Sequence, residues 1–231
     1  MGILGGMGPE ATMDLFSKIV RSTPASKDQD HLRIIIDNNP LIPDRQKAIL
    51  EDGSSPVPLM IKTARNLEAA GADFIVIPCN TAHYWIERIS NAVKISVVDM
   101  IDEAAEELSR SYPSVRTVGL LAATGTVRSK LYQQRLLEKG IRTVCPSDED
   151  QNRLMEAIYG VKAGDMSKSS AAVVRISRKL VAAGAEALIA GCTEIPLIIK
   201  PGDVSVPIID VTEVLAKRTV EIALGSVAPQ R

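Results

Sequence analysis

The sequence predicts an α/β protein made of two pseudo-symmetric domains, each with a mainly parallel four-stranded sheet, and an active site in the cleft between them. The first observation is an internal repeat: LEAAGADFIVIPCNT (67–81) matches LVAAGAEALIAGCTE (180–194) without a gap. The second is that short aliphatic runs alternate with longer stretches of helical composition in each half. That alternation is typical of β-α-β units and a parallel sheet.

The first half supplies four strands and four helices. The aliphatic runs predict strands at 2–5, 32–37, 73–78 and 95–98. The stretches between and after them predict helices at 10–22, 57–70, 81–92 and 100–110.

The second half repeats this order. GLLAATG (119–125) matches GILGGMG (2–8), and VPIIDV (206–211) matches ISVVDM (95–100), so the repeat extends on both sides of the cysteine region. The strands are expected at 117–122, 141–145, 186–190 and 206–209. The helices are expected at 126–138, 150–162, 168–183 and 211–224.

Composition excludes several classes of protein. The 231 residues carry a net charge of −1 with acids and bases interspersed, so neither nucleic acid nor an anionic membrane is an expected partner. No apolar run approaches the roughly 20 residues of a membrane span, and MGILGGMGPE lacks the basic start of a signal peptide. Three cysteines without a CxxC pair favour a reducing cytoplasm, and two histidines in total make a metal site unexpected.

Two cysteines occupy equivalent places in the repeat. Cys79 and Cys192 each follow an expected strand and precede a threonine, Thr81 or Thr193, that could cap the next helix or turn. Ligands of parallel sheets bind at the carboxyl ends of strands, and the unpaired N–H groups of a helix start lower the pKa of a thiol. We expect both thiols to be reactive, whereas Cys145 has no counterpart and is interpreted as a packing residue.

Two thiols on opposite walls of a cleft suit the inversion of a stereocentre. One thiolate removes a proton from a tetrahedral carbon, and the other thiol returns a proton to the opposite face. The carboxylate beside that carbon needs hydrogen bonds, which Asn80, Thr81 and Thr193 could donate.

The motifs PCNTAH, GCTEIP, GGMGP and NNPLIPDR together resemble the aspartate/glutamate racemase superfamily, and most of all its cofactor-independent aspartate racemase branch. The resemblance covers nearly the whole chain. It implies two similar α/β domains, at 1–99 plus 211–231 and at 100–210, with the C-terminal helix returning to the first. It also implies a homodimer and an acidic amino acid as the small-molecule substrate.

The resemblance also implies roles for single residues. Cys79 and Cys192 match the two acid/base thiols of the family, and Arg45 and Lys162 match basic residues that bind substrate carboxylates. Further pocket positions of the family match Met7, Gln46 and Thr124. The chain departs from the glutamate racemase pattern, because GGMG replaces an Asp-Ser-Gly and Glu194 stands where that branch has a histidine. Both departures favour aspartate or a broader substrate range over glutamate.

Two other functions stay open at this point. GMGPEA (6–11) satisfies the G-x-G-x-x-A pattern of dinucleotide-binding loops, which would indicate a nicotinamide-dependent oxidoreductase, although Pro9 crowds the loop. Two lobes around a cleft also describe a small-ligand binding module. Neither alternative explains two cysteines in register. His83, close to the first cysteine, is interpreted as a capping or packing residue.

Overall fold

The computed structural model describes residues 1–228, the side chain of Lys168 excepted. Residues 229–231 of the expected first domain lie outside this part. The chain forms two compact units: unit 1 contains residues 1–103 and the described residues from Thr212 onward, and unit 2 contains Ala104–Val211. The boundaries expected at 99/100 and 210/211 stay predictions beside this division.

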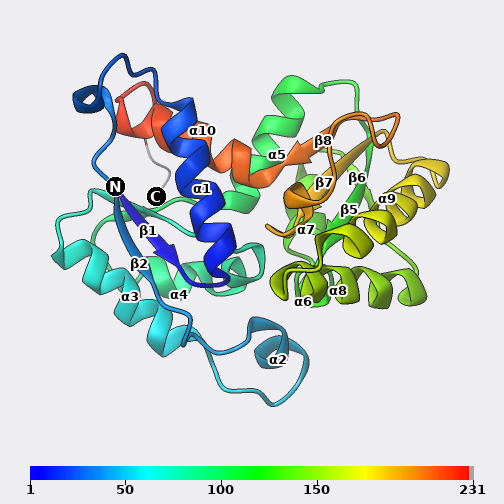
Figure 1. The fold of residues 1–231 in the computed structure, drawn as a ribbon, viewed down its shortest axis with the longest axis horizontal. Helices are drawn as coiled ribbons and strands as arrows, with labels where there is room; N and C mark the ends of the chain where they lie inside the picture. The colour runs from blue at the N-terminus through cyan, green and yellow to red at the C-terminus, as the bar shows by residue number, and fades with distance from the viewer. Residues whose placement is uncertain (229–231) are drawn as a thin grey trace. The chain divides into compact units, whose positions relative to one another are not determined.

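Each unit contains one four-stranded sheet in which every pair of strands is parallel, which confirms the predicted α/β fold class (Figure 1). Unit 1 has the order β2-β1-β3-β4 and unit 2 the order β6-β5-β7-β8, so the two sheets share one topology. The strands are β1 (Gly2–Gly5), β2 (Ile35–Asn38), β3 (Phe74–Val76), β4 (Ser96–Val97), β5 (Thr117–Ala122), β6 (Arg142–Val144), β7 (Ala187–Gly191) and β8 (Ile208–Asp210).

Helices connect the strands in both units. The α-helices are α1 (Pro9–Ser22), α2 (Arg45–Leu50), α3 (Val57–Ala69), α4 (Ile86–Ser90), α5 (Met100–Ser111), α6 (Thr124–Arg128), α7 (Leu131–Glu138), α8 (Asp148–Lys162), α9 (Met166–Ala182) and α10 (Val211–Ala223). Residues 1–228 also contain three 3-10 turns: η1 (Asp28–Asp30), η2 (Asn80–Trp85) and η3 (Ile195–Leu197). In residues 1–228 no helix is both long and apolar enough to cross a membrane.

The repeated L-x-A-A-G-A segment is a helix stop. After α3, Gly71 has a φ of 89°, and the Ala72 N–H donates to the Leu67 carbonyl at 3.1 Å. After α9, Gly184 has a φ of 95°, and the Ala185 N–H donates to the Leu180 carbonyl at 3.0 Å. A glycine in the left-handed region with this six-to-one bond is the Schellman motif, which satisfies carbonyls that the helix end leaves open. The same residues therefore end the helix before β3 and before β7.

In unit 1, α3 and α4 cover one face of the sheet. Leu4 of β1 and Ile75 of β3 belong to one buried cluster with Met60 and Leu67 of α3 and with Ile89 of α4. Each fully buried aliphatic side chain of this size contributes about 1.5–3 kcal/mol. Because side chains alternate along a strand, the neighbours of Leu4 and Ile75 point to the opposite face, where α1 packs against β1.

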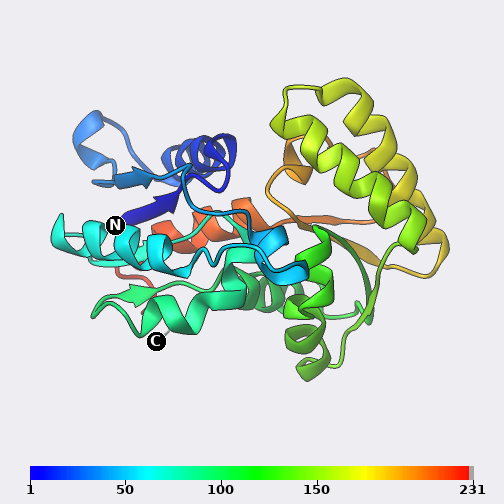
Figure 2. The same cartoon turned by 90° about the horizontal axis from the view of Figure 1, so that it is seen from below.

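In unit 2, α8 and α9 lie side by side on one face of the sheet (Figure 2). Leu121 and Leu188 of the sheet share a buried cluster with Leu154 of α8 and Leu180 of α9. On the other face, a Cβ added to Gly191 would lie 3.1 Å from the ring of Tyr132 in α7. This glycine therefore lets α7 approach the sheet at the residue before Cys192.

The expected helix at 81–92 is wrong in form: the segment is the 3-10 turn η2 followed by the short α4. In an α-helix the Cys79 carbonyl would accept the backbone N–H of residue 83. Here the Ala82 N–H donates to it at 3.2 Å, and the His83 ring lies 2.9 Å from it through Nδ1. A side chain thus replaces the α-helical partner and leaves a tighter turn.

Two further helix expectations need correction. The expected helix at 126–138 is divided into α6 and α7, because Lys130 between them has a φ of 58°, in the left-handed region. The short α2 was not expected at all. Asp44 caps it by accepting the backbone N–H groups of Gln46 at 2.6 Å and Lys47 at 3.1 Å.

Candidate active site

Unit 1 brings six predicted site residues to the edge of its sheet where the parallel strands end. Met7 follows β1, and Arg45 and Gln46 begin α2 in the connection after β2. Cys79, Asn80 and Thr81 follow β3 and form the start of η2. All are buried except Arg45 and Gln46, which are partly exposed.

Arg45 and Gln46 tie three of these segments together. The Arg45 guanidinium donates to the carbonyls of Ile42 at 3.1 Å and Pro43 at 2.9 Å, and to the Met7 carbonyl at 3.4 Å. The Gln46 side-chain amide donates to the Thr81 hydroxyl at 3.1 Å. Cys79, rather than Thr81, stands at the N-cap position of η2, and the Thr81 hydroxyl joins η2 to α2.

The loop after β1 is set by glycine. Gly6 has a φ of 93°, and a Cβ added there would overlap the backbone of Asn39. The Gly6 N–H donates to the Thr12 hydroxyl at 3.0 Å, so a residue of α1 takes the amide that a phosphate-binding loop would present to its ligand. The close approach of the two backbones places Met7 beside the segment that leads to α2.

His83 holds the backbone at Cys79. The ring is 2% exposed. Its Nε2 accepts the Met100 N–H at 3.1 Å, which leaves the proton on Nδ1, 2.9 Å from the Cys79 carbonyl. The ring joins the first thiol segment to the start of α5, which confirms the capping interpretation. The orientation of the Cys79 carbonyl, and with it the thiol, depends on this buried side chain.

Unit 2 brings together the four other predicted residues. Thr124 begins α6 after β5, Lys162 ends α8, and Cys192 and Thr193 follow β7. Cys192 and Thr193 are buried, while the Lys162 side chain is 37% exposed. As in unit 1, the cysteine lies at the carboxyl end of the third strand in the sheet order.

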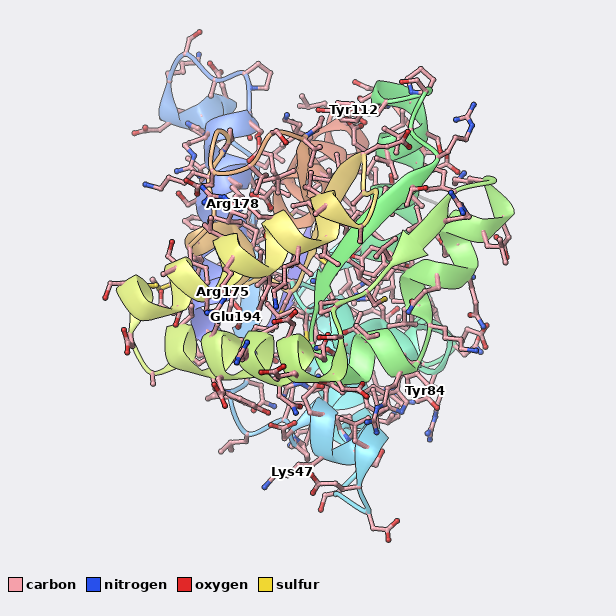
Figure 3. The ribbon with its side chains drawn as sticks, turned by 90° about the vertical axis from the view of Figure 1, so that its right-hand side faces the viewer. Lys47, Tyr84, Tyr112, Arg175, Arg178 and Glu194 are labelled. Carbon is pink, nitrogen blue, oxygen red and sulfur yellow. The ribbon has the colours of Figure 1, made fainter. Side chains whose placement is uncertain are left out.

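Glu194 joins three of these groups. The Cys192 thiol donates to its Oε2 at 3.0 Å, and the Thr193 hydroxyl donates to the same oxygen at 3.3 Å. The Lys162 ammonium lies 3.6 Å from Oε1. Figure 3 labels Glu194, seen in that view between the ribbons of α8 and α9. A thiol, a carboxylate and an ammonium therefore form one connected group within unit 2.

The environment of Cys192 overturns one expectation from the sequence. Burial raises the pKa of the Cys192 thiol well above its ordinary value, and the Glu194 carboxylate raises it further. Lys162 and the Glu194 backbone N–H oppose this by lowering the pKa. The expected lowering by a helix start is wrong here, because only the three-residue turn η3 follows and Thr193 binds Glu194 rather than capping. Cys192 is thus a thiol suited to donating a proton.

Gln151 positions Thr124. Its side-chain amide donates to the Thr124 hydroxyl at 3.2 Å and to the Ala122 carbonyl at 3.0 Å, and the residue is buried on α8. Within residues 1–228, its side-chain oxygen is a buried acceptor without a hydrogen-bond donor. Such an atom is costly unless a ligand or water meets it.

Sequence reasoning assigned no role to Glu194 or Gln151. Glu194 carried one signal, its position two residues after the second cysteine of the repeat. Gln151 carried no signal. It contacts the end of β5 from α8, and hydrophobic patterns do not predict which residue of a helix faces a given strand end. Cys145 lies outside both groups: burial raises the pKa of its thiol, and the Gln133 amide donates to it at 3.9 Å.

Comparison with known proteins finds relatives over nearly the whole chain. The model of the Asp/Glu/Hydantoin racemase family matches residues 4–219. Picrophilus torridus aspartate racemase has 36% sequence identity and a TM-score of 0.88, with 96% of this chain and 93% of that chain covered. An aspartate racemase homologue from Pyrococcus horikoshii OT3 has 31% identity and a TM-score of 0.78 over 96% and 98%. The broad-specificity amino-acid racemase RacX of Bacillus subtilis (strain 168) is 29% identical over 97% of this chain and 98% of its own.

Proposed function

The chain belongs to the Asp/Glu/Hydantoin racemase family, whose members are isomerases, and from that premise we propose that it is a cofactor-independent aspartate racemase. The single observation that carries the mechanism is the equivalence of the two cysteines. Cys79 and Cys192 follow β3 and β7, which hold the same place in two sheets of the same order. A duplicated scaffold with one thiol in each copy fits a reaction that is nearly symmetric.

The proposed reaction moves two protons. In one direction the Cys79 thiolate removes the Cα proton of the amino acid, and the Cys192 thiol donates its proton to the opposite face of the resulting carbanion. The product is the other enantiomer, with Cys79 now a thiol and Cys192 a thiolate. In the reverse direction the roles exchange, as microscopic reversibility requires. No electron pair leaves the substrate, so the step itself is balanced.

The remaining predicted residues are proposed to bind the substrate. The amide and hydroxyl groups near the two thiols would stabilise the α-carboxylate as negative charge develops. These groups belong to Gln46, Asn80, Thr81, Thr124 and Thr193, and the Met7 side chain is proposed to line the pocket beside them. Arg45 and Lys162 are proposed to bind the side-chain carboxylate of the substrate. Each places a cation in the group of site residues that also contains a thiol, Arg45 in unit 1 and Lys162 in unit 2.

Aspartate is supported by the likeness to the Picrophilus torridus aspartate racemase. A second candidate is racemisation of several amino acids, glutamate among them, which the likeness to RacX of Bacillus subtilis favours. We also propose a cytoplasmic homodimer, supported by the family resemblance and testable by light scattering.

The test is racemisation in heavy water without added cofactor. The purified chain is incubated with each L-amino acid, and the enantiomers are separated and analysed by mass spectrometry. We expect D-aspartate to form fastest and to carry deuterium at Cα from the first turnover, while remaining L-aspartate stays largely unlabelled. The Cys145→Ala variant serves as the control, because its thiol lies outside both groups of site residues.

The outcomes separate the candidates. Similar rates for many amino acids would replace aspartate by a broad substrate range. D-aspartate that keeps the original proton would contradict the two-thiol mechanism, since a single base returns what it removed. No racemisation of any amino acid would contradict the proposed function as a whole.

A further inference from the structure

The thiol of Cys192 and the carboxyl group of Glu194 share one hydrogen bond, and its proton belongs to one of the two groups. The sulfur and Oε2 lie 3.0 Å apart, and both residues are more than nine-tenths buried. A thiolate and a carboxylate at this distance would repel each other without water to screen them. One of the two groups therefore carries the proton that joins them.

The thiol is the group that holds it. A free thiolate binds a proton far more tightly than a free carboxylate does. Two further groups contact the carboxylate: the Thr193 hydroxyl donates to Oε2 at 3.3 Å, and the Lys162 ammonium lies 3.6 Å from Oε1. The Glu194 carboxylate is thus the acceptor of the S–H group.

We propose that Glu194 is a positioning residue that holds Cys192 in its protonated form, so that Cys192 is the proton donor of the free enzyme. This inference rests on the proposed racemase function. It assigns the two thiols different resting roles: the free enzyme accepts the enantiomer whose Cα proton faces Cys79. The other enantiomer is bound productively only by the form of the enzyme in which Cys192 has lost its proton beside an anion.

Lys162 moderates this effect. Its ammonium acts on the pKa of the Cys192 thiol in the direction opposite to Glu194. The Lys162 side chain is 37% exposed, whereas that of Glu194 is buried. If the side-chain carboxylate of the substrate takes up this cation, Glu194 loses part of its counter-charge, and the thiol is held in its protonated form more strongly. Substrate binding would then reinforce the donor role of Cys192.

The test is an ultraviolet titration of Cys192 alone. In the full chain with Cys79→Ser and Cys145→Ser, Cys192 is the only cysteine, and thiolate absorbance is followed against pH. The same chain with Cys192→Ser provides the baseline. Adding Glu194→Gln should raise the thiolate fraction about tenfold at a pH below the midpoint, as expected when a charged hydrogen-bond partner is removed. Adding Lys162→Met should lower the fraction, the opposite sign.

The opposite signs separate this role from a general disturbance of the fold, which would move both variants in one direction. Glu156→Gln is the matched control, because Glu156 is an exposed carboxylate of the same unit, and it should leave the titration unchanged. An unchanged or smaller thiolate fraction in the Glu194→Gln chain overturns the inference. If that chain does not fold, a fraction that rises with Lys162→Met overturns it as well.

The titration does not depend on racemisation, so the two proposals can fail separately. A titration that shifts as expected in a chain that racemises nothing would leave the role of Glu194 intact and remove the function. An active racemase whose Cys192 titrates alike with Glu194 and with Gln at that position would remove only the inference.

Discussion

The two thiol segments have equivalent places in the fold but different surroundings. At Cys79 a side chain contacts the backbone: the buried His83 ring lies 2.9 Å from the Cys79 carbonyl. At Cys192 a side chain contacts the sulfur itself: the thiol donates to the Glu194 carboxylate at 3.0 Å. Within residues 1–228, no side chain makes a hydrogen bond to the sulfur of Cys79. A repeated scaffold can thus place two identical groups while residues two to four positions later give them different surroundings.

The first prediction tests whether both thiols are required despite this difference. Cys79→Ala and Cys192→Ala should each reduce kcat for racemisation about 10³-fold in both directions, because general acid–base groups contribute about 10²–10⁴-fold. Enantiomer ratios followed by chiral chromatography provide the measurement, with Cys145→Ala as control. If either alanine variant kept a tenth of the wild-type rate, the two segments would not share one reaction.

The second prediction concerns the loops that follow the first strand of each half. Gly6 aligns with Ala123 in the repeat, but Gly6 has a φ of 93° and Ala123 a φ of −63°. Gly6→Ala should destabilise the fold by about 3 kcal/mol, since both backbone strain and overlap with Asn39 oppose a Cβ. Gly71→Ala, with positive φ and open space, should cost only about 1 kcal/mol.

Urea denaturation of both glycine variants measures the difference. Equal losses of unfolding free energy would mean that the approach of the Gly6 loop to Asn39 contributes nothing beyond the φ value. The two loops would then differ in stability only through the positive φ of Gly6.

The third prediction sharpens the role of His83. Replacing it by alanine leaves the Met100 N–H buried without its acceptor and should cost about 2 kcal/mol of unfolding free energy. His31→Ala, at an exposed position, should change stability by less than about 0.5 kcal/mol. A His83→Ala chain as stable as the wild type would show that the Cys79 segment needs no support from this ring.

The fourth and smallest effect concerns the two basic residues. Arg45→Ala and Lys162→Ala should each lower kcat/KM for aspartate about tenfold, because each removes a charge-assisted contact. The loss for alanine as substrate should be smaller. Lys47→Ala is the control, as Lys47 is an exposed cation of the same helix as Arg45 (Figure 3). Equal losses for the two substrates would indicate that neither residue reads the side-chain carboxylate.

The side chain of Arg45 donates hydrogen bonds to backbone carbonyls as well as carrying a charge. Its guanidinium bonds the carbonyls of Ile42, Pro43 and Met7. Arg45→Lys keeps the charge but loses the fork of donors, so it should restore less activity than Lys162→Arg does. The reverse order would indicate that the charge of Arg45 matters more than its hydrogen bonds.

Much of the fold could be predicted from the sequence because its signals are local. The strands β1 and β5 lie where the aliphatic runs predict them, and the repeated L-x-A-A-G-A segment encodes a helix stop through bonds between residues three to five positions apart. The candidate cysteines could be predicted for the same reason, since register within a repeat is visible without a structure.

The helix error after Cys79 arose because a side-chain partner overrides local preference there. The segment after Cys79 became a 3-10 turn because the His83 ring takes part in binding the Cys79 carbonyl. The contact of Gln151 with Thr124 crosses 27 residues, and that of Gln46 with Thr81 crosses 35. No pattern of hydrophobic residues encodes such pairs.

The sequence alone is enough to predict the duplication, the parallel α/β class, the two cysteines at strand ends and the helix stops before β3 and β7, because each depends on short-range geometry or on repetition. The contact of the Cys192 thiol with a carboxylate, in place of a helix start, became visible in the three-dimensional structure. That outcome depends on burial, which removes the water that would otherwise screen the Glu194 carboxylate from the sulfur. Two segments of nearly the same sequence therefore hold thiols of different character.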